Sequence, residues 1–218
     1  MILKLAGTVV VAGVIFLVTE YIRRLLKRDN EVSRKTVHIV HGLLIASWPF
    51  VLSGNWVYTI IIATELLFVC SVVLARRLGW FGWMWQVGRV SWGELMYPAG
   101  VTAAVVLAAN KWVFVAAILV LALGDAVAAL LGIKYGKTNS YRVFGQKKSV
   151  VGTTALMAVA VALFAVVVWF GPPMQASSLT VAALGFAVIM AATENLGTYG
   201  MDNMLLPVVA VLFLNSLY

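Results

Sequence analysis

One carboxylate, Asp125, lies inside an apolar run, in the segment LGDAVAALLGIKYGK. A charge at membrane depth costs about 3 kcal/mol or more, so such a residue usually serves a function. Around it, glycine or alanine recurs at every fourth position, at Gly124, Ala128, Gly132 and Gly136. This ridge either lets two helices pack closely or lets the backbone approach a phosphate, with Asp125 beside it as a ligand for Mg²⁺. The spacing leaves both interpretations open.

A basic loop, GQKKSVVG, follows this segment and directly precedes the next apolar run. Lys147 and Lys148 of this loop, and Lys137 just before it, supply point charges that suit phosphate oxygens. Ser149 is a candidate helix N-cap or phosphate donor, and Gly152 permits close approach. The P-loop pattern GxxxxGK[ST] is absent from the chain. The alternative is a solvated basic loop that only orients the neighbouring helices.

The stretch SRKTVHIVHG gathers cations and imidazoles at the start of another apolar run. Arg34, His38 and His41 fall at i, i+4 and i+7 on one helix face, and Lys35 neighbours His38 at i+3. They would form a basic wall against a phosphate, with His38 as a candidate base and His41 only packing. The alternative is a juxtamembrane cluster that sets topology. HxxH is half of a zinc motif, but no third ligand of the zinc type is nearby.

Most of the remaining acids lie near the ends of apolar runs. TENLGTYGMDNMLLP contains Glu194, Asp202 and Asn203, and carboxylates with an amide at a helix break suit a metal ion or a hydroxyl group. Glu94, in WGELMYP, is a further candidate base or ligand. Glu65 lies in the middle of TIIIATELLF without an evident partner and is assigned no chemistry.

The elements that must position these residues are membrane helices. The chain of 218 residues is 63% hydrophobic and 11% charged, with a mean hydropathy of +1.00, whereas soluble domains are about a quarter charged. A spanning helix needs about 20 mostly apolar residues. Eight segments come near that length: 5–22, 36–52, 56–75, 95–109, 112–133, 150–170, 179–193 and 203–217. We therefore expect an all-α, polytopic bundle of seven to eight helices. No linker divides the chain, so residues 1–218 form one domain, with a first helix over 5–22 and a catalytic core over about 33–218.

Loop charge fixes the orientation of these helices. If the N-terminus is outside, the loops after the first, third and fifth helices face the cytosol. They hold 14 of the 16 Lys and Arg residues: Arg23, Arg24, Lys27, Arg28, Arg34 and Lys35, then Arg76, Arg77 and Arg89, then Lys134, Lys137, Arg142, Lys147 and Lys148. The net charge of +8 therefore meets lipid headgroups, and nucleic-acid binding is not expected.

The same orientation places the unusual residues at one membrane face. Asp125 lies 13 residues beyond Trp112, about 20 Å along a helix, so it belongs to the cytosolic third of a hydrocarbon core of about 30 Å. His38, Glu94, Glu194 and Asp202 lie near that side on other helices. Scattered structural charges would not gather in this way, so we expect a functional site that opens to the cytosol.

The motifs RKTVHIVHG, GELMYPAG, LGDAVAALLGIKYGK, KKSVVG and ENLGTYGMDNMLLP, in this order, resemble the CTP-dependent lipid kinase family. That family includes dolichol (polyprenol) kinases, phytol kinases and CTP-dependent diacylglycerol kinases, and is distantly related to phosphatidate cytidylyltransferases. The resemblance covers nearly the whole chain after the first helix. It does not name the lipid.

The resemblance implies Mg²⁺-assisted transfer of the γ-phosphoryl group of CTP, or UTP, to the hydroxyl of a membrane alcohol. It makes Asp125 and Asp202 the metal or phosphate-site acids. Glu194 and Asn203 are further candidate ligands from the residue pattern at the helix break, not from the resemblance. Lys148 and Ser149 would contact the nucleotide, and Arg34, Lys35 and His38 would form the third basic wall. Two rivals remain: a cytidylyltransferase acting on a lipid phosphate, and an ion-coupled transporter that uses Asp125, Glu65 and Glu194. The sequence does not fix the oligomeric state.

Overall fold

The computed structural model describes residues 30–218 apart from 53, 55 and 81–91; before residue 30 it describes only positions 6, 7, 10, 13, 17 and 21. The expected first helix over 5–22 therefore lies largely outside the described residues, as do Arg23, Arg24, Lys27, Arg28 and Arg89. Everything below concerns the described part of the chain.

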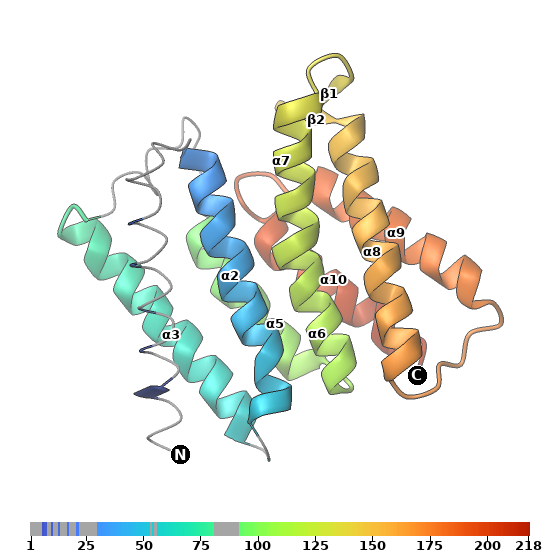
Figure 1. The fold of residues 1–218 in the computed structure, drawn as a ribbon, viewed down its shortest axis with the longest axis horizontal. Coiled ribbons are helices and arrows are strands. Elements are labelled where there is room, and N and C mark those ends of the chain that lie inside the picture. The colour runs from blue at the N-terminus through green and yellow to red at the C-terminus, as the bar shows by residue number, and fades with distance from the viewer. Residues whose placement is uncertain are drawn as a thin grey trace.

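That part is a bundle of helices with one small hairpin (Figure 1), which confirms the all-α expectation. The helices are α2 (Asn30–Val51), α3 (Trp56–Arg77), α5 (Gly93–Leu107), α6 (Lys111–Leu119), α7 (Asp125–Tyr135), α8 (Val150–Phe170), α9 (Leu179–Leu196) and α10 (Asp202–Asn215), with a π-helical turn η1 (Val120–Gly124). Their bounds follow the apolar runs to within a few residues, except that α2 begins six residues before the expected 36. Four of the described helical segments are long and apolar enough to cross a membrane: Val57–Arg77, Lys111–Tyr135, Val150–Phe170 and Leu179–Leu196. Helices α5 and α10 are shorter apolar helices.

One continuous helical segment, α6–η1–α7, occupies the centre of the bundle. Its π-helical turn is buried and ends directly before Asp125, where the Asp125 N–H donates to the carbonyl of Val120. Single π-helical turns inside α-helices are often found at functional sites. Here the turn places the carbonyl of Leu121 within 3.0 Å of the His38 Nε2 on α2.

The basic loop between α7 and α8 folds as a β-hairpin, which differs from the unstructured loop expected from the sequence. Strand β1 (Ser140–Val143) pairs antiparallel with β2 (Gln146–Ser149), with Tyr141 opposite Lys148. Phe144 and Gly145, at the turn, both have positive φ angles, 46° and 79°, as a two-residue type I′ turn requires. Phe144 is an unusual residue at such a position, so the turn carries a weak sequence signal.

The helix ends define a hairpin end of the bundle (Figure 1), at which α2 begins, α3 and α7 end, and the hairpin protrudes. Helix α3 lies at one edge, with α2 between it and the central segment. The core is formed by apolar side chains of all layers, among them Val101, Ile118, Leu121, Leu156 and Leu206. The break at Gly171, Pro172 and Pro173 ends α8 at Phe170 as expected.

Candidate active site

A cavity of about 430 Å³ opens beside the hairpin, between α2, α7, α8, α9 and α10. It is lined by four lysines and four acids: Lys35, Lys137, Lys147, Lys148, Glu31, Asp125, Glu194 and Asp202. Apart from Ile133, its other lining residues are small or bear a hydroxyl group, and include Ala128, Gly132, Gly136, Ser140, Ser149, Gly152 and Thr153. The structure thus gathers charges from five separate segments at one site.

Asp125 is buried and forms an ion pair with the buried ammonium group of Lys35, which α2 supplies. The Nε2 atom of His38 lies 3.6 Å from the same carboxylate oxygen, Oδ2. Because the carbonyl of Leu121 can only accept, the Nε2 atom of His38 that faces it carries a proton. His38 therefore donates to the π-helical turn beside Asp125, and it lies outside the cavity lining.

Lys148 and Glu194 form the second ion pair of the cavity. The ammonium group of Lys148 contacts the Glu194 side chain and also donates to the Glu194 backbone carbonyl at 3.0 Å. It reaches from the hairpin to the last turn of α9, so it connects two walls of the cavity.

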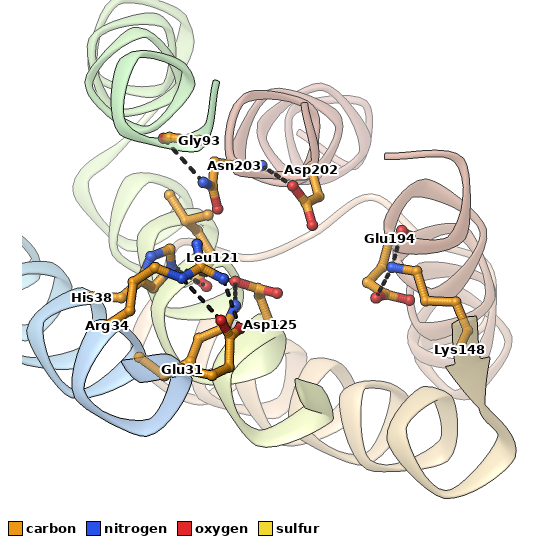
Figure 2. A network of polar contacts seen from close by, with 11 residues as sticks. Glu31, Arg34, His38, Gly93, Leu121, Asp125, Lys148, Glu194, Asp202 and Asn203 are labelled. Carbon is orange, nitrogen blue, oxygen red and sulfur yellow. Dashed lines mark hydrogen bonds and ion pairs between the residues drawn. The ribbon is translucent and has the colours of Figure 1, made fainter. Parts of the chain in front are cut away.

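Asp202 lies between these two pairs, and Figure 2 shows its carboxylate directed into the space that separates them. Burial, and then the negative charge of Asp125, raise the pKa of Asp202 to about 6, while Lys35 and Lys148 oppose this rise. Among the described residues Asp202 forms no ion pair. Its neighbour Asn203 donates from its side chain to the carbonyl of Gly93 at 3.0 Å, which fixes the start of α10 against α5.

The floor of the cavity is the close contact between α7 and α8. Ser149 caps α8 by accepting from the Gly152 N–H at 3.0 Å. A Cβ atom at Gly132 would lie 2.9 Å from the Ser149 hydroxyl, and one at Gly152 would lie 2.7 Å from the carbonyl oxygen of Ala128. These glycines therefore serve close packing and also line the cavity. The approach of their backbone to a phosphate stays a prediction.

Five of the candidate site residues lie away from the cavity lining. Arg34 pairs with Glu31 at 2.6 Å, and Glu94 pairs with Arg76 at 2.5 Å. Gly124 belongs to the π-helical turn and would have only ordinary contacts with Leu156 as an alanine. His38 lies 3.6 Å from Asp125, and the backbone N–H of Asn203 donates to Oδ1 of Asp202 at 3.1 Å.

Some residues at or beside the cavity were not predicted from the sequence. Glu31 lies one helical turn before Lys35, on the same face, a spacing that could have indicated it. Thr153 follows Gly152 in α8 and lines the cavity. Tyr141, in β1, donates to the side-chain oxygen of Asn195 at 2.8 Å and lies 2.5 Å from the Thr153 hydroxyl.

Comparison with known proteins identifies the family. The chain is 32% identical over 201 residues to a phytol kinase from Synechocystis sp. (strain ATCC 27184 / PCC 6803 / Kazusa), a match that covers 89% of this chain and 83% of that protein. The chain belongs to the CTP-dependent lipid kinase family. The family prediction is thereby confirmed, and the chain is a phosphotransferase with an alcohol acceptor. No family profile matches the chain, and no solved structure matches it. The distant relation to phosphatidate cytidylyltransferases stays a prediction.

The donor set of the cavity suits what a lipid kinase must bind. Within the described residues, no three Asp, Glu, His or Cys side chains are close enough to hold a metal ion by themselves. Mg²⁺, however, is commonly held by one or two carboxylates together with substrate phosphates and water. Asp125 and Asp202 face one cavity, so they fit such a site, whereas a zinc site with its preformed set of four ligands does not fit.

Proposed function

We propose that this lipid kinase transfers the γ-phosphoryl group of CTP to the hydroxyl of a long-chain membrane alcohol, with phytol as the first acceptor to test. The similar protein from Synechocystis is named a phytol kinase, which supports the acceptor. One observation carries the rest: four lysines and the acids Asp125 and Asp202 line a single cavity of about 430 Å³. Polyprenol, dolichol and diacylglycerol are the alternative acceptors.

The lysines of the hairpin region are the proposed triphosphate clamp. Lys137 and Lys147 are exposed at the mouth of the cavity, and Lys148 reaches into it. Lysine supplies a compact charge that suits phosphate oxygens. When the triphosphate enters, Lys148 exchanges Glu194 for phosphate, and Lys35 exchanges Asp125 in the same way. Ser149, Gly132 and Gly152 form the surface on which the phosphates lie.

Asp125 and Asp202 are the proposed ligands of Mg²⁺, and Glu194 becomes a third oxygen donor when Lys148 leaves it. The ion would neutralise the charge that develops on the transferred phosphoryl group. His38 holds the π-helical turn directly before Asp125, and Asn203 holds the start of α10, so both residues position the elements that carry the ligands rather than bind the metal. Arg34 keeps Glu31 at the edge of the cavity.

In the reaction, the alcohol oxygen forms a bond to the γ-phosphorus while the bond from that phosphorus to the β–γ bridging oxygen breaks. The products are a lipid monophosphate, CDP and the proton lost by the alcohol. Phosphoryl transfer depends mainly on positioning and charge neutralisation, which the cavity supplies. The proposal assigns no base to Glu94, because Glu94 pairs with Arg76 outside the lining.

The orientation follows from loop charge. We propose that the hairpin end faces the cytosol, with seven to eight spanning helices and the N-terminus outside, because the basic residues gather at that end. A water-soluble nucleotide then enters from the cytosol, and a lipid hydroxyl reaches the cavity from the membrane. The chain acts as one domain, and its oligomeric state does not enter the proposal.

The test uses purified protein with Mg²⁺, CTP labelled at the γ- or the α-phosphate, and a panel of phytol, polyprenol, dolichol and diacylglycerol. We expect γ-label in phytyl phosphate. Appearance of α-label in lipid with release of pyrophosphate would instead show a cytidylyltransferase. UTP, ATP and GTP in the same assay define the donor.

Two matched lysine variants test whether Lys148 belongs to the proposed triphosphate clamp. Lys148→Gln should lower transfer by about 100-fold or more, because positioned charges contribute that much to such reactions. Lys134→Gln is the control, since Lys134 lies over the Tyr135 ring at 4.9 Å and does not line the cavity. Equal activity of the two variants would contradict the proposed clamp.

A further inference from the structure

A second polar cluster lies away from the cavity, between α2, α3 and α5. Glu65 is 1% exposed, and neither of its carboxylate oxygens has a hydrogen-bond partner in the described part of the chain. The Nε2 atom of the His41 imidazole lies 3.7 Å from Oε1 of Glu65. The hydroxyl of Tyr97 is likewise buried without a partner. We call Glu65, His41 and Tyr97 the α3 cluster.

Three buried polar atoms without partners at one place require an explanation, because native proteins satisfy nearly all such atoms. A small guest that both donates and accepts hydrogen bonds would satisfy them, since a carboxylate accepts and a phenol or imidazole can donate. A metal ion is a poor guest, because the cluster contains one carboxylate and one imidazole and no phosphate is placed there to complete a coordination shell. A hydroxyl group or a water molecule fits these donors and acceptors.

The α3 cluster is connected to the cavity by aromatic contacts. The ring of His41 stacks on that of Tyr97 with centroids 5.3 Å apart, and Tyr97 meets His38 edge to face at 4.6 Å. The Nε2 of His38 then lies 3.6 Å from Asp125. A row of polar side chains thus leads from Glu65 to the proposed site of phosphoryl transfer.

This row runs across the bundle and not along it. His38 and His41 are three residues apart on α2, so the row advances by only about 4.5 Å along that helix while it passes from α3 to α7. Helix α3 is at the edge of the bundle (Figure 1) and exposes apolar side chains such as Leu66 and Leu67. One end of the row is therefore next to a lipid-facing helix.

We propose that the α3 cluster binds the hydroxyl group of the long-chain alcohol as it enters laterally from the bilayer, before it reaches Asp125. The hydroxyl donates to Glu65 and accepts from the Tyr97 hydroxyl, so its desolvation inside the membrane is offset on the way. This inference rests on the proposed function, because it assumes an alcohol acceptor.

Binding is measured apart from transfer, with a long-chain alcohol that carries a photoreactive diazirine, in the absence of nucleotide. Its methyl ether, which cannot donate a hydrogen bond, is the matched probe. We expect the alcohol to label the wild-type protein more than the ether does. Glu65→Leu and Tyr97→Phe should each lower this specific labelling about fivefold, as expected for one lost hydrogen bond. Glu65→Gln keeps an acceptor oxygen, so it should retain part of the specific labelling that Glu65→Leu loses.

The kinetic readout separates this role from a general loss of structure. Glu65→Leu and Tyr97→Phe should each raise the KM for the alcohol about fivefold and leave the KM for the nucleotide unchanged. Thr64→Val is the control on the same helix, because the buried Thr64 hydroxyl only donates to the carbonyl of Ile60 at 2.9 Å. Tyr97→Phe retains both ring contacts, so it serves if Glu65→Leu fails to fold.

Equal labelling by the alcohol and the ether, or labelling that Tyr97→Phe leaves unchanged, would show that the cluster holds water only and would overturn the inference. An equal rise in both KM values would point to a structural role and would overturn it too. Specific labelling without phosphate transfer to any alcohol would contradict the proposed function while supporting the hydroxyl site.

Discussion

The hairpin places Lys148 in the cavity, and one phenol holds the hairpin in place. Tyr141 lies opposite Lys148 in the β1–β2 register, and residues directly opposite in an antiparallel pair project from the same face. The Tyr141 hydroxyl lies 2.5 Å from Thr153 on α8 and donates to Asn195 on α9 at 2.8 Å. We therefore predict that Tyr141→Phe weakens nucleotide binding, although Tyr141 does not line the cavity.

The size of the effect follows from the two hydrogen bonds that are lost. Each contributes about 1 kcal/mol net, so about 2 kcal/mol of hairpin docking is removed. A difference of this size is a factor of about 30 in an equilibrium, which sets the upper limit for the rise in the KM for CTP. The KM for the alcohol should stay unchanged, because the hairpin lies at the opposite side of Asp125 from the α3 cluster.

The assay is transfer of γ-label from CTP to phytol at varied concentrations of each substrate, with thermal unfolding of the same samples in detergent. Tyr135→Phe is the control, because that ring is exposed and lies before the hairpin. A double-mutant cycle with Asn195→Ala should show coupling, since the two side chains share a hydrogen bond. An unchanged KM for CTP in Tyr141→Phe, within about twofold, would refute the reasoning.

Three further predictions concern the same site. Gly152→Ala puts a methyl group 2.7 Å from a backbone carbonyl of α7 and should lower the free energy of unfolding by about 1 to 3 kcal/mol; Gly185→Ala, whose nearest contact is 3.8 Å, should not, and equal thermal unfolding of the two would contradict this. Chelation by EDTA should abolish transfer and added Mg²⁺ should restore it, with Asp202→Asn requiring about tenfold more Mg²⁺; transfer that persists in EDTA would show the metal assignment to be wrong. Glu94→Gln should keep kcat within about tenfold, because a general base contributes about 100-fold or more; a larger loss in steady-state kinetics would return Glu94 to the reaction.

Hydropathy was sufficient to predict the helices in the described part of the chain, whereas the orientation drawn from loop charge stays a prediction. Apolar runs report burial in lipid directly, so the bounds of α8 were predicted to the residue and those of most other helices to within a few. The gathering of acids and lysines at one end followed from the same pattern, because residues at corresponding ends of antiparallel helices lie at one depth. The hairpin was missed, since Phe144 at a positive φ gives no turn signal.

Pairing between side chains could not be predicted, because it depends on how each helix is rotated about its axis. Lys35 and Asp125 are 90 positions apart and meet only after α2 and α7 have packed. Glu94 and His38 looked equivalent as bases, yet one pairs with Arg76 outside the cavity and the other donates to the Leu121 carbonyl. Sequence spacing selects residues on one helix face, whereas partners on other helices decide which of those residues can do chemistry.

The balance of charge in the cavity suggests how nucleotide and metal would depend on each other. Four lysines face four acids, so the cavity is close to neutral and its strongest groups already form pairs, Lys35 with Asp125 and Lys148 with Glu194. A triphosphate alone would have to separate these pairs and leave carboxylates uncompensated, which is costly where water is scarce. A divalent cation alone would face the paired ammonium groups. Only when both enter does every lysine gain a phosphate and every released carboxylate gain a cation, so the arrangement favours binding the two together.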